Sequence, residues 1–408
     1  MPPITSRRVL LVAPNVSRKM GGEALKALQI ATELQRFGHR VRQVAHARVR
    51  NELRHEAPEL DVTYLEDSLA QRLLYRLRLQ MPLSWFNAWQ LHRLAEREAR
   101  TFRAELVHFT APISPVLPYF RFDGPPVVIG PLNGNLSFPA AFRQREPLKY
   151  RLSRLLLRPG QAVLGAMFKG KRQARLLVAG GARTVAALKA GGCRDEQIVR
   201  TLDCGLPDAL LDRTRLEHHG ANQRFVFLGR LVGYKGCDLA IRGVARAGEG
   251  VTLDIIGDGP ERARLETLVD ELQLRDRVNF VGWLAPGRAL HDRLQEYRGL
   301  VFPSLAEANG IVYQEAMALG LPIIAIDWGG VRELIDDGEG VLVAPSSEQQ
   351  VVAQLGQAMA ALAGSPEWAN QLSRAARSKA DRLGFRWQCL LREWDQVYAD
   401  VGNRALHG

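Results

Sequence analysis

Short apolar runs alternate along the chain with longer segments whose apolar residues recur at helical spacing. Each run has the length of a buried strand, and the runs span residues 8–14, 39–47, 60–65, 104–109, 125–131 and 175–180 in the first half and residues 224–230, 251–259, 277–283, 299–304, 321–328 and 340–345 in the second. Between the first two runs, residues 21–39 have helical spacing, and Gly38 is placed to end a helix. Strands and helices in repeated order predict an α/β fold of parallel sheets covered on both faces.

The length of the chain and a polar stretch near its middle predict two domains. A chain of 408 residues is long for one domain and suggests two of roughly 200 residues each. The stretch between about Asp203 and Arg224 is polar and contains Gly and Pro, so we expect residues 1–205 and 206–385 to form two doubly wound, Rossmann-like domains. Residues 386–408 have the pattern of an amphipathic helix that packs back across the domains. Two such domains facing one another would enclose a deep cleft lined by the loops after the strands.

Basic residues outnumber acidic ones, with a net charge of +12 and a pI near 9.9. Such a charge favours an anionic partner. The segment from Arg143 to Arg175 holds ten Lys or Arg and one acid, interleaved with Leu, Tyr, Met and Phe, which predicts contact with an anionic membrane surface. The alternative for this segment is a solvated helical face. No motif of an RNA-binding module accompanies the charge, so we do not expect nucleic acid as a partner.

Hydropathy and cysteine usage bear on the location of the protein. No run approaches the 18 or so uncharged apolar residues that a membrane-spanning helix needs. The four cysteines lack the spacing of a metal site, which favours a reducing compartment: Cys193, Cys204, Cys237 and Cys389. We therefore expect a cytoplasmic protein, at the inner face of the cytoplasmic membrane if the basic segment binds lipid.

Two loops carry residues suited to binding phosphate. Arg230 and Lys235 follow the run at 224–230 and precede a predicted helix, and cations beside a helix N-terminus suit a diphosphate. Their spacing is not that of a Walker loop. Gly21 and Gly22 open the helix after the first run and permit close approach of the backbone to an anion or a sugar, although the GxGxxG fingerprint is missing. The alternative for Arg230 and Lys235 is that they are two surface cations, and the alternative for Gly21 and Gly22 is a plain turn.

Polar residues also follow two strands of the first predicted domain. His108 and Thr110 lie at the end of the run at 104–109, and Asn133 follows the run at 125–131. Loops after parallel strands meet at one edge of a sheet, so we expect all three to face the cleft. For His108 the alternative is a structural histidine.

The stretch "EANGIVYQEAMALG", residues 307–320, places two glutamates around an apolar helix. Glu307 lies in the loop after the run at 299–304, and residues 308–311 are expected to begin the helix with their amides pointing into the cleft. Glu315 then lies two turns into the helix, among apolar residues. A buried carboxylate needs partners. The alternative to a ligand is an ion pair between Glu315 and Arg332.

The order and spacing of these motifs resemble the family-4 retaining glycosyltransferases of the GT-B fold. The two glutamates separated by seven residues resemble the family signature, and "GRLVGYKG", "IIGDGPERARLE" and "VNFVGW" precede them in the family's order. The resemblance is strong from about Phe225 to Pro345 and weaker over the first domain. At Asn309 the family often has a bulky aromatic residue, so this position leaves the transferred sugar open.

The resemblance implies a role for each matched position. Arg230 and Lys235 would bind the donor diphosphate and stabilise the leaving nucleotide. Glu315 would accept hydrogen bonds from the ribose hydroxyls, and Glu307 would contact the transferred sugar. The remaining positions of the donor site would be Gly22, Gly257, Ala308, Asn309, Gly310 and Ile311, with His108 near the sugar as a further catalytic residue. Thr110 and Asn133 would bind the acceptor.

The expected activity is transfer of a hexose from a nucleotide-diphosphate sugar to a membrane-associated saccharide or lipid-linked acceptor, in the synthesis of a surface polysaccharide or glycolipid. The sequence has no Asp-x-Asp pair to carry a bridging divalent ion, so we expect metal-independent transfer without a cofactor. The resemblance implies retention through a front-face mechanism. Two alternatives stay open: a nucleotide-sugar epimerase of the same architecture, and a non-catalytic protein that binds nucleotide sugar.

Overall fold

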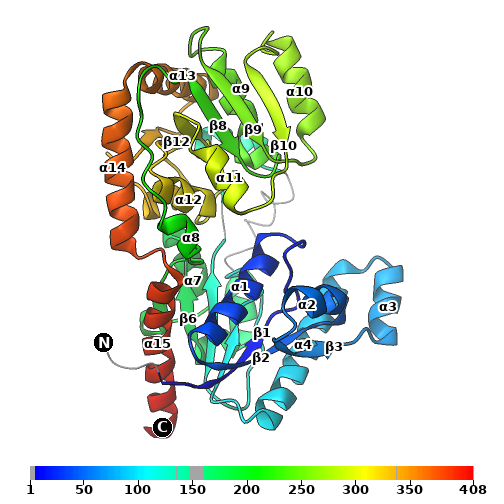
Figure 1. Ribbon diagram of the computed structural model, residues 1–408. Helices are drawn as coiled ribbons and strands as arrows, with labels where there is room; N and C mark the ends of the chain where they lie inside the picture. The colour runs from blue at the N-terminus through cyan, green and yellow to red at the C-terminus, as the bar shows by residue number, and fades with distance from the viewer. Residues whose placement is uncertain (1–4, 135–136, 148–159, 337, 408) are drawn as a thin grey trace. The chain divides into compact units, whose positions relative to one another are not determined.

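The computed structural model describes residues 5–134, 137–147, 160–336 and 338–407. The chain divides into two compact units (Figure 1). Unit 1 comprises residues 1–135, 155–204 and 387–408, and unit 2 comprises residues 136–154 and 205–386.

Unit 1 is built on a parallel sheet that has seven strands among the described residues, in the order β3-β2-β1-β4-β5-β6-β7. The strands are β1 (Arg8–Val12), β2 (Arg40–His46), β3 (Asp61–Leu65), β4 (Leu106–Phe109), β5 (Val127–Leu132), β6 (Arg175–Val178) and β7 (Ile198–Arg200). The helices are α1 (Gly22–Arg36), α2 (Arg50–Glu56), α3 (Leu69–Arg76), α4 (Gln80–Thr101), α6 (Gly170–Gln173), α7 (Ala182–Ala190) and α15 (Trp387–His407).

Unit 2 repeats this plan with a parallel sheet that has six strands in the described part of the chain, in the order β10-β9-β8-β11-β12-β13. The strands are β8 (Arg224–Leu228), β9 (Thr252–Ile256), β10 (Val278–Gly282), β11 (Gly299–Val301), β12 (Ile323–Ile326) and β13 (Val341–Val343). The helices are α8 (Asp208–Leu211), α9 (Cys237–Val244), α10 (Arg262–Glu271), α11 (Arg288–Leu294), α12 (Ile311–Leu319), α13 (Glu348–Gly364) and α14 (Pro366–Leu383).

Every apolar run singled out in the sequence forms a strand, and the helix predicted after the first run is α1. In both sheets the chain order reverses beside the first strand, so that β1 lies between β2 and β4, and β8 between β9 and β11. Loops that leave the carboxyl ends of parallel strands at such a reversal are where ligands bind in doubly wound folds. The sequence missed β7, a three-residue strand at the end of its sheet.

Alternate residues of β1 pack into two hydrophobic clusters, one on each face of the unit 1 sheet. Val9 and Leu11 lie in a cluster with residues of α1 and α15, whereas Leu10 and Val12 lie in a cluster with residues of α4. Successive side chains of a strand point to opposite faces, so helices cover this sheet on both sides. This explains why the first run is continuously apolar.

The last helix, α15, completes the core of unit 1. Trp394 is fully buried in the same cluster as Val9 and Leu11, and its indole Nε1 donates a hydrogen bond to Thr201 Oγ1 at 2.9 Å. Asp395 of the same helix forms an ion pair with Arg7. The chain therefore returns to its first unit after passing through unit 2.

Residues 137–147 belong to unit 2, although the sequence placed them in the first domain. Trp328 Nε1 donates to the carbonyl oxygen of Ser137 at 2.7 Å. Arg145 forms ion pairs with Asp238 at 2.7 Å and with Glu348 at 2.6 Å. These interactions tie the segment to unit 2, through residues far away in the sequence.

His108 lies inside the core of unit 1, with no part of its ring exposed. Its Nε2 is 2.8 Å from the carbonyl oxygen of Gly130, and its Nδ1 is 2.8 Å from the hydroxyl of Tyr398. A carbonyl oxygen only accepts hydrogen bonds, so the neutral ring donates from Nε2 and accepts at Nδ1 from Tyr398. Burial lowers the pKa of His108 to about 4, against the opposing effect of the Gly130 hydrogen bond.

This burial predicts a dependence of stability on pH. Between about pH 6.5 and pH 4 the unfolded chain protonates His108 while the folded chain does not, so the free energy of unfolding falls as the pH falls through this window. We expect His108→Gln to reduce that fall by up to about 3 kcal/mol, measured by urea denaturation at several pH values. Part of the dependence remains in the variant, because burial also lowers the pKa of His218 to about 4. His219→Gln, at an exposed position, is the control; an identical pH dependence in wild type and His108→Gln would contradict the assignment.

Candidate functional site

The turn between β8 and α9 presents the two predicted phosphate-binding cations. Arg230 is exposed directly after β8, and Lys235 ends a short 3-10 helix, η4 (Gly233–Lys235), just before α9 begins at Cys237. Gly257, at the end of β9, packs against this turn: a Cβ atom there would lie 2.0 Å from the carbonyl oxygen of Gly229, and its φ is +144°. Only glycine fits at 257.

Lys235 forms an ion pair with Glu307, which lies in the loop after β11. Both side chains are largely buried, with 18% of Lys235 and 15% of Glu307 exposed. The ammonium group also lies 5.0 Å from the centroid of the Phe302 ring. Charges removed from water need partners, so the pair holds the loops after β8 and β11 together.

The loop after β12 fixes the backbone of Glu307 and Ala308. The amide of Gly330, in the 3-10 helix η5 (Gly329–Glu333), donates to the carbonyl oxygen of Glu307 at 2.8 Å. A Cβ atom on Gly330 would lie 1.7 Å from the carbonyl oxygen of Ala308. Three successive loops of the sheet, after β8, β11 and β12, thus meet around Glu307.

Helix α12 begins at Ile311, not at Ala308 as predicted from the sequence. Gly310 caps it in the left-handed conformation with φ 64°, so Ala308 and Asn309 belong to the preceding loop and Glu315 lies one turn into the helix rather than two. Ile311 is exposed, whereas Ala308 and Asn309 are buried.

The carboxylate of Glu315 has a histidine as its neighbour. His291 Nε2, on α11, lies 3.6 Å from Glu315 Oε1, a contact that is too long for a hydrogen bond. Arg332, the partner that the alternative gives to Glu315, binds Asp327 at 2.5 and 2.7 Å. Glu315 thus keeps hydrogen-bonding capacity.

Nε2 of His291 and Nδ2 of Asn309 are buried near the glutamates and have no hydrogen-bond partner in the described part of the chain. His291 is 6% exposed and Asn309 is 5% exposed. Buried polar groups are nearly always satisfied in folded proteins, so unpaired atoms here indicate a place where a polar ligand or water completes the site. Sequence reasoning missed His291, because a single histidine in a helical segment carries no signal of its own.

In unit 1, Asn133 joins a buried polar cluster rather than standing alone. Asn133 Nδ2 and Lys26 Nζ both donate to Asp203 Oδ1, at 2.9 and 2.6 Å. Lys26 and Asp203 were not singled out in the sequence, where 177 residues separate them. Thr110 is fully buried, as His108 is, which argues against the predicted contact between its side chain and an acceptor. Gly22 is exposed as the first residue of α1, with no atom within 4 Å of where its Cβ would be.

His108 is buried in the core of unit 1, although the sequence predicted that it would face the cleft. Its ring is enclosed in the core, both nitrogens are occupied by Gly130 and Tyr398, and its pKa is lowered by burial. A catalytic group must touch the substrate, so this placement argues against the catalytic role and supports the alternative of a structural histidine.

Part of the basic segment from Arg143 to Arg175 lies outside the described residues, including Arg151, Arg154 and Arg158. Among its described bases, Arg145 forms ion pairs within unit 2. Lys171 is buried and donates to the carbonyl oxygen of Pro115, and burial lowers its pKa to about 8. These two bases therefore serve the fold of their own units.

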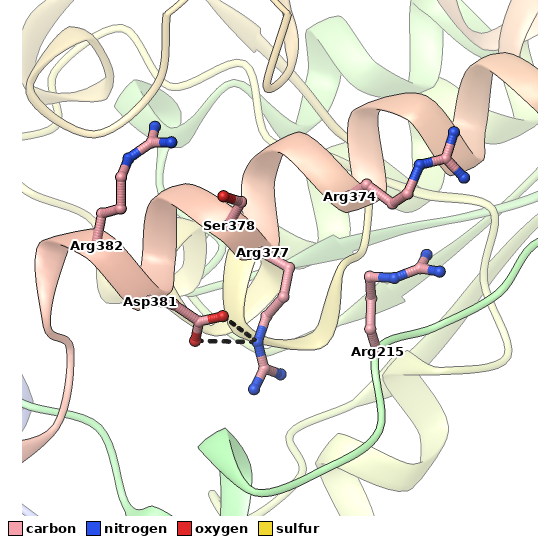
Figure 2. Close-up of a pocket in the computed structure, with 6 residues that line it drawn as sticks. All are labelled: Arg215, Arg374, Arg377, Ser378, Asp381 and Arg382. Carbon is pink, nitrogen blue, oxygen red and sulfur yellow. Dashed lines mark hydrogen bonds and ion pairs between the residues drawn. The ribbon is translucent and has the colours of Figure 1, made fainter.

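A hollow on the surface of unit 2 is lined mainly by arginines of α14 (Figure 2). Arg377 lies in its middle, binds Asp381 at 3.3 Å and donates to the carbonyl oxygens of Arg213, Ala318 and Leu211. This arginine therefore joins α14 to α8 and α12. Arg374 and Arg382 extend from the same helix and are exposed.

Within the ranges that the structure describes, no helix is long and apolar enough to cross a membrane. The same ranges contain no group of three or more His, Cys, Asp or Glu side chains placed to hold a metal ion.

Comparison with known proteins identifies the part of the chain that carries Lys235, Glu307 and Glu315. Residues 211–379 match the family model described as glycosyl transferases group 1. These residues are a glycosyl transferases group 1 domain. The relatives include the alpha-D-kanosaminyltransferase of Streptomyces kanamyceticus, 35% identical over 138 residues, and the lipopolysaccharide core biosynthesis glycosyltransferase LpsD of Rhizobium meliloti, 36% identical over 135 residues. These alignments cover 32% and 33% of this chain, and the chain spans 34% and 38% of the two relatives.

The fold of the group 1 domain and its companion unit is GT-B. The crystal structure of Anabaena HepE in complex with UDP and glucose is similar to this chain with a TM-score of 0.65 and 17% identity, covering 97% of this chain and 100% of HepE. The GT-B fold predicted from the sequence is therefore confirmed.

The packing of Gly330 against Ala308 predicts that one added methyl group at position 330 destabilises the folded protein. We expect Gly330→Ala to lower the free energy of unfolding by about 2 kcal/mol or more, because the backbone around Glu307 must move. Urea denaturation of the full chain measures this cost. Gly364→Ala, at the end of α13 with no atom within 4 Å, is the matched control and should be neutral or stabilising by up to about 1 kcal/mol. Equal stabilities of the two variants would contradict the packing described.

Proposed function

We propose that this protein is a retaining glycosyltransferase that moves a hexose from a nucleotide-diphosphate sugar to a saccharide or lipid-linked acceptor. The observation that carries the proposal is the ion pair between Lys235 and Glu307, within the group 1 domain, where Glu307 precedes Glu315 by eight residues. The name of LpsD places that relative in lipopolysaccharide core biosynthesis, which supports a role in the synthesis of a surface polysaccharide or glycolipid.

Arg230 and Lys235 would bind the donor diphosphate. When the bond between the sugar and the phosphate breaks, negative charge grows on the leaving nucleotide, and fixed cations stabilise that charge more than the charge of the intact donor. The ammonium of Lys235 is held in place by Glu307 and Phe302 before any donor binds. We therefore propose a transfer that needs no metal ion and no other cofactor.

Glu315 would accept hydrogen bonds from the ribose hydroxyls, and Glu307 would contact the transferred sugar. The exposed fraction of the Glu315 side chain is 15%, and its contact with His291 is too long for a hydrogen bond, so hydroxyl donors of the ribose would satisfy the carboxylate. Asn309 would offer its unpaired amide to the sugar. The backbone at Gly257, Ala308, Gly310 and Ile311 would approach the donor, as would Gly22 of unit 1.

Retention would follow from attack on the same face that the nucleotide leaves. The acceptor hydroxyl oxygen forms a bond to the anomeric carbon as the bond from that carbon to the phosphate oxygen breaks, and the hydroxyl proton passes to the leaving phosphate oxygen. Positive charge develops on the sugar ring in this step, and the carboxylate of Glu307 would favour it. No proton acceptor on the protein is required.

The acceptor would bind to unit 1, at Asn133. The hydrogen-bonded cluster of Asn133, Lys26 and Asp203 supports this assignment, since hydroxyl groups of a saccharide both donate and accept hydrogen bonds. A lipid-linked acceptor would place the protein at the cytoplasmic face of a membrane. Contact of residues 143–175 with anionic lipid stays a prediction.

The test is turnover of labelled nucleotide sugars in the presence of a lipid extract. We expect release of the nucleoside diphosphate together with labelled sugar in the lipid fraction from one or a few members of a panel of UDP-, GDP- and ADP-hexoses. Lys235→Ala should reduce turnover by at least about a hundredfold, because a charge-stabilising group is lost. Arg374→Ala, at an exposed position on α14, is the control and should leave turnover unchanged.

Each alternative gives a different result in this assay. An epimerase would interconvert two nucleotide sugars without releasing the nucleotide. A non-catalytic binding protein would be stabilised by a nucleotide sugar in a thermal shift assay and would turn none over. Either result would contradict the proposed transfer.

A further inference from the structure

The helices α3 and α4 of unit 1 carry a row of large apolar side chains that are exposed to solvent. We call this the α3–α4 surface and define it by Leu69, Leu73, Tyr75, Leu77, Trp85 and Trp89. Leu69 is 84% exposed and Tyr75 is 73% exposed. Single apolar residues are common on protein surfaces. Leu69, Leu73 and Leu77 recur every four residues, so they line one side of α3 and its C-terminal end, and such a group of exposed apolar side chains marks an interaction site. Figure 1 shows α3 beside α4 at the outer edge of unit 1.

The start of α3 and its contact with α4 determine which side chains of α3 are exposed. Ser68 and Gln71 form a capping box that starts the helix. Gln71 is buried and donates from Nε2 to Asn87 Oδ1 on α4 at 2.7 Å. The helix therefore turns the polar side chain of Gln71 toward α4 and leaves Leu69 and Leu73 exposed, the reverse of a helix that packs its apolar side on a core.

A neighbouring helical segment extends the same apolar surface. Residues 160–167 are helical, and Val163 and Met167 are exposed, the latter by 67%. Phe168, the next residue, packs edge-on against Trp85 of α4 with 5.5 Å between the ring centroids. The α3–α4 surface and the helical segment at residues 160–167 therefore meet at Trp85, and both belong to unit 1.

The charges around the α3–α4 surface select among possible partners. Residues 68–95 contain four arginines and no aspartate or glutamate. Arg72, Arg76 and Arg78 lie among the exposed leucines and are themselves exposed. If two copies of the chain paired symmetrically through this surface, these arginines would face one another and repel.

We propose that the α3–α4 surface docks unit 1 onto a bilayer that contains anionic lipid. Leucine side chains enter the acyl region, the tryptophans and the tyrosine lie at the headgroup level, and the arginines bind lipid phosphates. This inference rests on the proposed function, because docking onto a bilayer would bring the protein to an acceptor that is linked to a lipid. The α3–α4 surface is different from most of the basic segment at residues 143–175, for which the sequence predicted contact with a membrane.

Flotation of the full chain with vesicles tests the docking directly. We expect binding to vesicles of phosphatidylcholine with phosphatidylglycerol, weaker binding to pure phosphatidylcholine, and a decrease with added salt. The triple variant Leu69→Gln, Leu73→Gln and Leu77→Gln should reduce the partition coefficient on the order of tenfold or more, since each leucine loses burial in the membrane. The positions are exposed, so the melting temperature should stay close to that of the wild type.

Arginine variants test the electrostatic part. Arg72→Gln with Arg76→Gln should reduce binding to the anionic vesicles on the order of tenfold and leave the weak binding to neutral vesicles unchanged. Arg374→Gln with Arg382→Gln, which removes the same charge from the exposed face of α14, is the matched control and should bind like the wild type.

Three results would overturn the proposal. The wild type could fail to float with either kind of vesicle, or the leucine and arginine variants could float as well as the controls. In the third result, the wild type would self-associate in sedimentation without binding vesicles, and the leucine variant would lose this self-association. The α3–α4 surface would then be a contact between copies of the chain.

The vesicles hold no sugar nucleotide and no acceptor, so this test is separate from that of the proposed function. Lys235→Ala should float like the wild type. A chain that floats but releases no nucleotide contradicts the transferase alone, and a chain that turns over nucleotide sugar but does not float contradicts the docking alone.

Discussion

The candidate donor site depends on the ion pair between Lys235 and Glu307. The two side chains come from loops after β8 and β11, and both are withdrawn from water far enough that neither is stable without an opposite charge. Close backbone packing by Gly330 on the loop after β12 prevents Glu307 from moving away. An anionic ligand can therefore compete for Lys235 without a large change in the backbone, which is what a preorganised phosphate site requires.

Hydrophobic patterning was sufficient to predict most of the fold. Strands of a parallel sheet are buried on both faces, and β1, with Val9 to Val12 fully buried, shows why such strands are continuous apolar runs. The pattern fails where burial is incomplete: β7 has three residues, and Arg200 at its end is exposed. The start of α12 was also misplaced, because nothing in "EANGI" distinguishes a helical turn from a loop closed by the left-handed Gly310.

The donor site was more predictable than its surroundings. Lys235, Glu307 and Glu315 follow strands that are adjacent in one sheet, so their proximity could be expected from the order of the elements. His108 was misjudged because the end of a strand in sequence does not reveal what covers it, and here the cover is Tyr398, 290 residues away. The cluster of Lys26 and Asp203 was missed for the same reason. Long-range packing, which sequence spacing does not encode, decided these cases.

The central claim is that Lys235, which is paired with Glu307 in the free protein, binds the diphosphate of the donor, and calorimetric titration with a nucleoside diphosphate measures this binding directly. The ligand would be whichever of UDP, GDP and ADP stabilises the wild type most. We expect Lys235→Ala to weaken binding on the order of tenfold or more, because a charge-assisted contact is lost. Glu307→Gln should strengthen it, because the competing carboxylate is removed from Lys235. Unchanged affinity in both variants would contradict the claim.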